Sequence, residues 1–302
     1  MRANARPVLP VWVCAVLLLA VLRVEPAAAA VPDAEVEGLQ LPVWLVRAGK
    51  REPLALGSRL RNGDRIESGS GARILLRLAD GSLVKLGEHA RFSLDGMART
   101  RQGAGLFNAT LGVLQGAFRF TTTAFYDYRG SREVQVRFTT VTVGIRGTDL
   151  WGKSTEDRDL VALIEGKVTL ERIGEGPVTM DQARTVYQAP RNARALPIEP
   201  IAAEQLGLYA AETEIVAGQG ALGKGGRWRV YAARANNQSE ALALYDRLRE
   251  AGYPVTIDPV LADGRTVYRV RITGLLSERD GTAVAVNLKV ELGLDEVSVS
   301  LY

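Results

Sequence analysis

Cysteine and histidine are almost missing from this sequence, with one of each in 302 residues. Cys14 lies in an N-terminal apolar run, so a chain that loses this run has no disulfide, no thiolate metal site and no cysteine nucleophile. His89 is not accompanied by the cluster of His, Cys and carboxylate residues that a zinc site needs. We therefore expect neither a metal nor any other cofactor.

Catalytic motifs are also lacking. The sequence contains no nucleophile elbow and no phosphate-binding loop. Asp157 and Asp159 lie in a charged stretch, which favours solvated turn residues over a glycosidase pair. No catalytic acid can be nominated, and we expect a non-catalytic protein.

A strong excess of one charge is missing too. The formal net charge is +4, and residues 227–302 carry ten basic and ten acidic side chains. Nucleic-acid-binding surfaces normally show dense basic clusters. We expect no nucleic-acid partner.

The first thirty residues are typical of an export signal. Arg2 and Arg6 precede an apolar run from Val8 to Leu22, and Ala27 to Ala30 supply the small residues that a signal peptidase needs. The run is shorter than the roughly 20 residues of a bilayer-spanning helix. We expect residues 1–30 to be cleaved, leaving no stable membrane span; an uncleaved membrane anchor is the alternative.

Residues 31–190 predict an all-β domain. Short alternating runs are separated by Gly-rich turns, and no long segment has the 3.6-residue period of a helix. The Asp80-Gly81 pair between two such runs predicts a β-hairpin. The apolar positions that this hairpin is expected to bury are Leu76, Leu78, Leu83 and Leu86.

Residues 191–226 predict a Pro/Gly-rich linker. Pro197 and Pro200 lie near its start, and a helix is expected over Ile201–Val216. Five glycines then follow within nine residues, and such a composition predicts a flexible hinge. The glycines are Gly218, Gly220, Gly223, Gly225 and Gly226.

Residues 227–302 alternate between strand and helix patterns. Strands are expected at 227–235, 254–260, 266–274 and 296–302, with a turn at Asp263-Gly264. One helix is expected to begin at Asn237 or Ser239 and to stop at Gly252, and the other covers 277–293. The order β-α-β-β-α-β predicts a small α+β, ferredoxin-like module with two helices on one face of a four-stranded sheet. The whole chain is therefore expected to be multidomain, with this module after the all-β domain.

Strand alternation predicts which side chains the open face of that sheet carries. Those expected to face the helices are Trp228, Val230, Ala232, Tyr268, Val270 and Ile272. Those expected to face outward are Arg229, Tyr231, Ala233, Val267, Arg269 and Arg271, joined by Thr256 and by Ser298 or Ser300. Tyrosine rings stack on the C–H faces of sugars, and guanidinium groups donate hydrogen bonds to hydroxyl and acyl oxygens. The open face is a candidate glycan-binding surface.

The same residues resemble the SPOR family, over the whole of 227–302. The segments that carry the resemblance are RWRVYAARANNQSEALALYDRLREAGYPVTI and VYRVRITGLLSERDGTAVAVNLK. The resemblance implies binding to peptidoglycan glycan, especially to strands stripped of stem peptides, as in many division and envelope proteins. Many members carry Gln where Tyr231 stands, followed by Gly-Ser-Phe instead of Ala233, Arg234 and Ala235. Either stacking replaces the amide contact here, or the affinity for glycan is altered.

The β-rich part resembles the FecR domain family, from about Ala55 to Gln188. The segments are GDRIESGSGARILLRLADGSLVKLGEHARFSL, VTVGIRGTDLWG and VALIEGKVTLE. We expect Gly144–Asp149 to form a buried turn that closes the sheet, with Arg146 paired to Asp149 or to an internal carbonyl. In signalling members the domain follows a cytoplasmic anti-sigma segment and a membrane span. Neither precedes it in this sequence, so the resemblance implies a periplasmic binding or scaffold role.

Together these features predict a periplasmic, cell-wall-associated envelope protein. Its C-terminal module is expected to bind denuded peptidoglycan glycan, and its β domain a ligand or another envelope protein. A periplasmic sensor or regulatory component of a FecR-type signalling system is the alternative, and a peptidoglycan-active enzyme such as a lytic transglycosylase is the least supported. Enrichment at the division site favours the first hypothesis, and loss of a transcriptional response on deletion favours the second.

Overall fold

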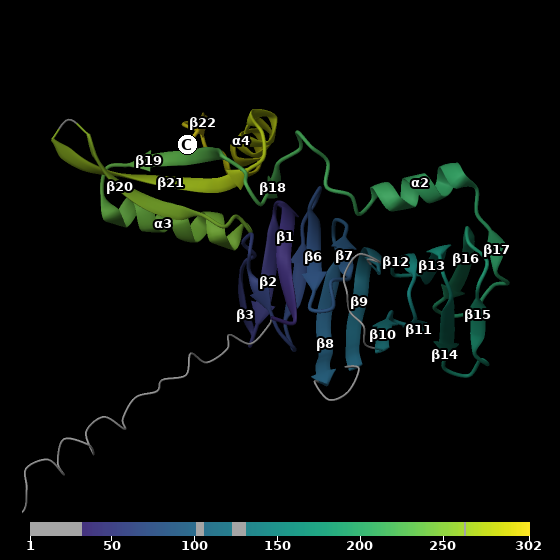
Figure 1. The fold of residues 1–302 in the computed structure, drawn as a ribbon. Helices are drawn as coiled ribbons and strands as arrows, with labels where there is room; N and C mark the ends of the chain where they lie inside the picture. The colour runs from purple at the N-terminus through teal and green to yellow at the C-terminus, as the bar shows by residue number, and fades with distance from the viewer. Residues whose placement is uncertain (1–31, 101–105, 123–130, 263) are drawn as a thin grey trace, which may run out of the picture. The chain divides into compact units, whose positions relative to one another are not determined.

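The computed structural model describes residues 32–100, 106–122, 131–262 and 264–302, and these form 22 strands and three helices (Figure 1). The expected signal segment with Cys14, and Asp263 of the expected turn, lie outside the described residues. No helix among the described residues has both the length and the apolarity to cross a membrane.

The β domain contains the first seventeen strands. They are β1 (Ala34–Gln40), β2 (Val43–Arg47), β3 (Lys50–Pro53), β4 (Arg59–Leu60), β5 (Arg65–Ser68), β6 (Arg73–Leu78), β7 (Leu83–Leu86), β8 (Arg91–Thr100), β9 (Leu106–Thr121), β10 (Ser131–Arg137), β11 (Val141–Ile145), β12 (Asp149–Ser154), β13 (Arg158–Glu165), β14 (Val168–Arg172), β15 (Val178–Met180), β16 (Thr185–Pro190) and β17 (Glu199–Pro200).

Two sheets of the β domain share the long strand β9. One sheet runs β3–β2–β5–β8–β9–β10–β11–β14–β15, and the other runs β1–β6–β7–β9–β12–β13–β16–β17. The first half of β9 pairs with β8 and β10, and the second half pairs with β7 and β12. Gly116 stands where the strand changes sheets. Its φ is +84°, and a Cβ there would lie 2.6 Å from the Cα of Ala90, so only glycine is accommodated.

The predicted hairpin at Asp80-Gly81 is present between β6 and β7. Leu76, Leu78 and Leu86 are buried as expected, but Leu83 is only half-buried. Because side chains of a strand alternate between faces, Leu83 and Leu86 cannot both point inward, and Val84 occupies the core position instead.

The segment between the β domain and the C-terminal module is not the flexible hinge that its glycines predict. α2 (Ala203–Ala211) is shorter than the expected helix, and residues 221–223 form a buried strand, β18 (Ala221–Gly223). Leu222 of β18 pairs with Leu39 of β1 on one side and with Leu275 of the module on the other. The glycines here allow close backbone contact rather than conformational flexibility. A Cβ on Gly226, for example, would lie 2.2 Å from the carbonyl oxygen of Gly274.

Polar contacts also fix this segment. Asp280 is 1% exposed, and its Oδ1 accepts hydrogen bonds from the amides of Gly218, Gly220 and Ala221 at 2.7, 3.1 and 2.8 Å. Earlier in the segment, Glu214 accepts from Lys85 Nζ at 2.5 Å. Ordered partners at both ends leave little conformational freedom between them.

The C-terminal module has the predicted β-α-β-β-α-β order. Its elements are β19 (Trp228–Ala235), α3 (Gln238–Glu250), β20 (Thr256–Ala262), β21 (Arg265–Leu275), α4 (Glu278–Leu292) and β22 (Ser298–Leu301). The strands form an antiparallel sheet in the order β20–β21–β19–β22. Asn237 and Ser277 cap the two helices, each accepting a hydrogen bond from the amide three residues later.

The module contacts the β domain directly. The indole Nε1 of Trp44 donates to the carbonyl of Glu250 at 2.9 Å, and the amide of Val43 donates to the carbonyl of Gly252 at 3.3 Å. Gly252 has a φ of +86°, and a Cβ there would lie 2.7 Å from the Trp44 ring. The glycine that ends α3 therefore also makes room for the indole.

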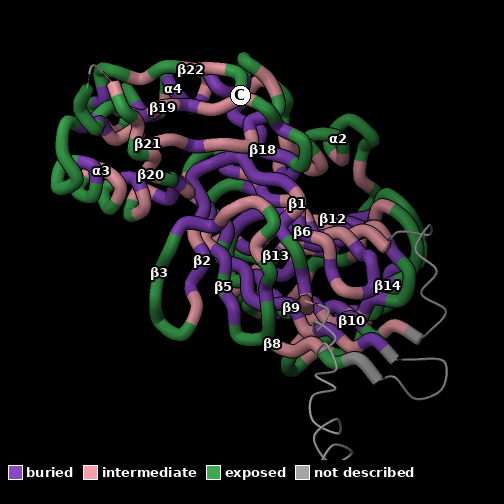
Figure 2. The backbone as a smooth tube through the Cα atoms, turned by 60° about the vertical axis from the view of Figure 1, so that its left-hand side comes forward, coloured by how far each residue is buried: buried purple, intermediate pink, exposed green. Residues whose placement is uncertain are grey.

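Burial follows the same organisation (Figure 2). Buried positions recur along β1, β2, β6 and β9 in that view, whereas α2 has no buried residue. α2 is held by stacking of Tyr209 on Trp151, with ring centroids 4.2 Å apart.

Candidate functional site

One face of the C-terminal sheet packs against both helices. Val230 and Ala232 of β19 and Val270 and Ile272 of β21 are each 0% exposed, as expected for side chains that face α3 and α4. The side chains that alternate with them along β19, Arg229 and Tyr231, are half-exposed. The opposite face therefore carries the candidate side chains.

Four of the six predicted site residues form one row across all four strands of this face. Thr256 is opposite Arg271, Arg271 is opposite Tyr231, and Tyr231 is opposite Ser298. Residues directly opposite one another in an antiparallel sheet lie on the same face with Cβ atoms about 5 Å apart. We call these four residues the open-face row. Residues far apart in sequence are thereby brought into one line.

The other two predicted residues flank the row. The guanidinium carbons of Arg229 and Arg269 lie 5.2 and 5.3 Å from the centre of the Tyr231 ring, within cation–π range. Arg229 Nε also donates to Ser300 Oγ at 3.1 Å, so Ser300 belongs to the face together with Ser298. The three side chains form a cluster of one aromatic ring between two cations.

Three contacts of this face are not obvious from the sequence. Asp258 forms an ion pair with Arg271, with Nε and Oδ2 2.8 Å apart. Tyr302 lies 5.4 Å from the Arg229 guanidinium, and its hydroxyl donates to the carbonyl of Gly226 at 3.1 Å. Alternation from Thr256 places Asp258 on the face, whereas nothing in the sequence pattern marks the chain's last residue.

Val267 does not lie on the surface as alternation predicts, because it is 4% exposed. The pairing of β19 with β21 ends at Ala235 and Tyr268, and the β20–β21 hairpin continues beyond it (Figure 1). Val267 therefore lies past the four-stranded part of the sheet, where alternation alone does not determine burial. A bulge in β19 between Tyr231 and Ala233 disturbs the register nearby.

Ile145 ends β11, and residues 146–148 turn into β12, with Gly147 at a φ of +66°. The turn is not buried as expected, because Arg146 and Gly147 are exposed. The predicted pairing of Arg146 with Asp149 is wrong, because Asp149 binds Arg119, with Nη2 and Oδ2 2.7 Å apart. The hydrogen bond with Asp149 raises the pKa of Arg119 against the opposing effect of burial. The β domain uses this pair to fix β9 against β12.

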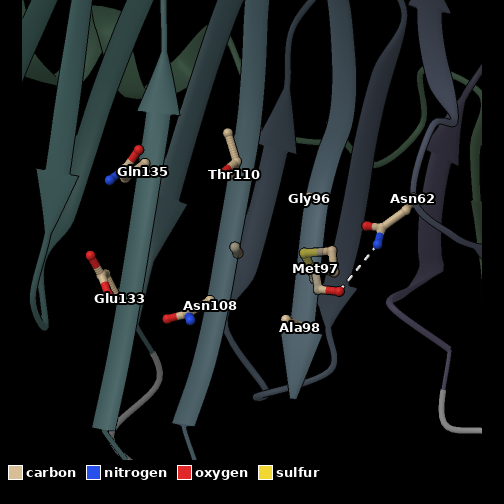
Figure 3. Close-up of a pocket in the computed structure, with 9 residues that line it drawn as sticks. Asn62, Gly96, Met97, Ala98, Asn108, Thr110, Glu133 and Gln135 are labelled. Atoms are coloured by element: carbon tan, nitrogen blue, oxygen red, sulfur yellow. Dashed lines mark hydrogen bonds between the residues drawn. The ribbon is translucent and has the colours of Figure 1, made fainter. Parts of the chain in front are cut away.

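A shallow hollow of about 400 Å³ lies on the β domain (Figure 3). Asn108 and Thr110 of β9 and Glu133 and Gln135 of β10 point into it from neighbouring strands. Its lining mixes these polar side chains with apolar ones such as Met97 and Ala98 and contains no aromatic side chain, so it offers hydrogen bonds but no stacking surface.

The carboxylates considered for catalysis have structural partners. Asp157 is exposed and pairs with Arg158 at 2.8 Å. Asp159 is not a solvated turn residue as expected, because it is 0% exposed and accepts hydrogen bonds from Arg191 and Thr140. Among the described residues, no group of three or more His, Cys, Asp or Glu side chains could hold a metal ion.

Two family models match separate parts of this chain. Residues 64–169 match the family model described as FecR protein, and residues 224–300 match that of the SPOR domain. No curated protein matches the chain.

Solved structures that resemble this one include two crystal structures of a proposed anti-sigma factor from Parabacteroides distasonis ATCC 8503. They are 14% and 15% identical, cover 79% of this chain and 99% and 97% of their own, and each has a TM-score of 0.38. The FecR match lies within the β domain, and the SPOR match covers most of the C-terminal module. The chain combines a FecR domain with a C-terminal SPOR domain.

Proposed function

We propose that this protein is a non-catalytic, exported envelope protein that binds peptidoglycan glycan strands through the open face of its SPOR domain. The observation that carries the proposal is the open-face row with Tyr231 between two arginines. A sugar ring presents C–H groups to an aromatic ring and hydroxyl oxygens to guanidinium donors, so it can use both parts of the cluster. The SPOR match itself supports peptidoglycan as the polymer.

In this proposal the protein is periplasmic and cell-wall associated, and its signal segment is removed. The FecR domain serves as a scaffold that presents a ligand- or protein-binding surface, for which the hollow of Figure 3 is one candidate. The domain limits that follow are 31–190 for the β domain, 191–226 for the connecting segment and 227–302 for the SPOR domain.

A pull-down with purified sacculi tests the proposal. We expect amidase-treated sacculi, whose strands lack stem peptides, to retain the mature protein, and Tyr231→Ala to weaken retention roughly five- to tenfold. Loss of one aromatic stacking contact of about 1–1.5 kcal/mol corresponds to this factor. Arg229→Ala should act in the same direction because it removes a donor beside the ring.

Arg279→Ala is the matched control, since Arg279 is exposed on α4 and away from the open face. If the wild-type protein stays in the supernatant, or if Tyr231→Ala binds like the control variant, the glycan assignment fails.

A second candidate function is a periplasmic sensor or regulatory component, and the FecR match over 64–169 favours it. Deletion of the gene would then abolish a transcriptional response to an extracellular signal. A complementing Tyr231→Ala variant separates the two functions, because it should restore a purely regulatory response while failing to bind sacculi.

A further inference from the structure

A cavity of about 510 Å³ lies at the end of the open face where the SPOR domain meets the β domain. Thr256, Thr273 and Tyr302 line it from the SPOR sheet. Pro53 and Leu56 line it from the β domain, and the buried strand β18 with the glycine-rich turn after it closes a further side. The walls therefore come from parts of the chain that are far apart in sequence.

The cavity is continuous with the open-face row. Thr256 belongs to both, and Thr273 is opposite Arg229 in the register of β19 and β21. The Arg229 guanidinium lies between two rings, 5.2 Å from Tyr231 and 5.4 Å from Tyr302. A polymer bound on the row can reach the cavity without leaving the protein surface.

The lining combines apolar surface with positive charge. Its apolar part consists of proline, leucine and valine side chains, namely Pro53, Leu56, Leu222, Pro254 and Val255. Two cationic residues, Lys224 and Arg249, belong to the lining, and no carboxylate does among the described residues. Arg249 lies 3.7 Å from Glu52, which offsets its charge, whereas Lys224 is exposed. Such a lining suits a group with an apolar body and a negative charge.

We propose that this cavity binds a carboxylate-bearing sugar residue of the glycan, with Lys224 as its cation and the FecR domain as one wall. The inference rests on glycan binding by the open-face row and assigns the substituent that the row alone does not recognise. In peptidoglycan, the lactyl group of muramic acid has these properties. Its methyl is apolar, and its carboxylate is free once the stem peptide is removed but is an uncharged amide while the peptide is attached.

The contact between the two domains holds the FecR-domain wall of the cavity in place. β18 pairs with both sheets, and Trp44 is hydrogen-bonded to the end of α3, so Pro53 and Leu56 are held beside the open face. A SPOR domain without this neighbour would present only the sheet side of the cavity.

Binding of the full mature chain to two soluble glycan preparations tests the inference. One is glycan oligosaccharide from amidase-treated sacculi, and the other is the same material after its carboxylates have been converted to amides. We expect the wild-type protein to bind the carboxylate form about tenfold more tightly, the usual worth of one charge-assisted hydrogen bond. Lys224→Glu should abolish that preference, and Leu56→Trp, which fills the cavity from the β-domain side, should weaken binding of the carboxylate form by a similar factor.

Lys167→Glu is the matched control, because it makes the same charge change at a lysine that is 65% exposed on the β domain. Thermal unfolding checks that each variant is folded. If Leu56→Trp does not fold, Lys224→Glu still tests the inference, because Lys224 is exposed and its substitution should not disturb the fold. Wild-type affinity and preference in both variants would overturn the inference. An equal loss of affinity for both preparations in Lys224→Glu would also overturn it. Tyr231→Ala separates this inference from the proposed function. If Tyr231→Ala loses binding and Lys224→Glu does not, the cavity assignment is wrong but the open-face row still binds glycan. If Tyr231→Ala has no effect, the proposed function itself is wrong.

Discussion

Single side chains on the open face differ in how much of their binding capacity is already used. Tyr231 has two guanidinium groups near its ring, and these orient it without consuming its hydroxyl. Arg271 is paired with Asp258 at 2.8 Å, so fewer of its donors are available to a ligand. Arg229 and Arg269 have no carboxylate ion-pair partner among the described residues within 4.0 Å, so their charges are less compensated than that of Arg271. Arg229 does donate to Ser300 Oγ and to the carbonyl of Leu301. We therefore rank Arg269 first, Arg229 second and Arg271 third as candidate glycan contacts.

A buried carboxylate in the β domain gives a prediction at the same scale. Asp64 is 2% exposed and accepts hydrogen bonds from Arg47 Nε at 2.7 Å and from the Arg61 amide at 2.9 Å. Burial alone would raise the pKa of Asp64, but these bonds more than offset it and hold the pKa below its ordinary value. A depressed pKa adds stability above the unfolded-state pKa of about 3.9, and that stability is lost as pH falls through the folded-state value.

We expect Asp64→Asn to lower the free energy of unfolding by about 2 kcal/mol at pH 7, the cost of removing a charged hydrogen-bond partner. Denaturant unfolding between pH 7 and pH 3 measures this, and the difference from wild type should shrink below about pH 4. A difference that stays constant over this range would contradict the account.

Residue-level patterns in the sequence predict a large part of the site. Alternation along two strands, β19 and β21, is sufficient to place Arg229, Tyr231 and Arg269 on one face. It does not predict the Arg271–Asp258 pair, because that contact is diagonal between strands and depends on the twist of the sheet. It also misplaces Val267, which lies beyond the end of the β19–β21 pairing, where alternation alone does not determine burial.

Among the elements, β18 departs most from expectation. Three residues in a glycine-rich stretch form a strand because their flanking amides have a buried acceptor in Asp280, and because β1 and β21 each offer an unpaired edge at that point. Composition alone predicts a flexible chain there, since it cannot reveal a partner 60 residues away. Glycine has no side chain, and this property suits a closely packed strand such as β18 as well as a flexible linker.

Asp280→Ala tests this element. The substitution leaves three amide donors of the β18 segment without their acceptor, and each such loss in a buried position costs about 1 kcal/mol or more. We expect the free energy of unfolding to fall by roughly 3 kcal/mol and amide hydrogen exchange of residues 218–223 to accelerate. Asp280→Asn keeps an acceptor oxygen and should retain most of the protection. Equal exchange in all three proteins would show that β18 does not depend on Asp280.

The molecule as a whole unites two domains that the sequence suggests are loosely tethered. Trp44, which the sequence marks only as an apolar strand residue, binds the end of α3 through its indole nitrogen. Arg51 lies 3.8 Å from the centre of the same ring, and Arg249 approaches Glu52 at 3.7 Å. Contacts of this kind depend on shape at both surfaces, so they cannot be predicted from either domain's pattern alone.

Trp44→Ala tests the coupling between the domains. We expect wild-type protein to unfold in one cooperative transition and Trp44→Ala to unfold in two, with the SPOR domain melting separately, and with a total loss of roughly 2–3 kcal/mol for a half-buried aromatic side chain. Trp44→Phe, which keeps most of the ring but loses the donor, should be intermediate. A single transition in Trp44→Ala, unshifted from wild type, would mean that the contact contributes nothing to stability.

β18 pairs with β1 of the β domain and with β21 of the C-terminal sheet. The open face is therefore connected to the β domain through paired strands and not only through a flexible linker. A tensile load applied to a bound glycan strand would thus be transmitted to β1 through backbone hydrogen bonds, with no slack to take up first. In the proposed envelope role, this arrangement would make the protein a stiff connector between the wall and the partner of the β domain, with the three-residue pairing of β1 with β18 as part of the load path.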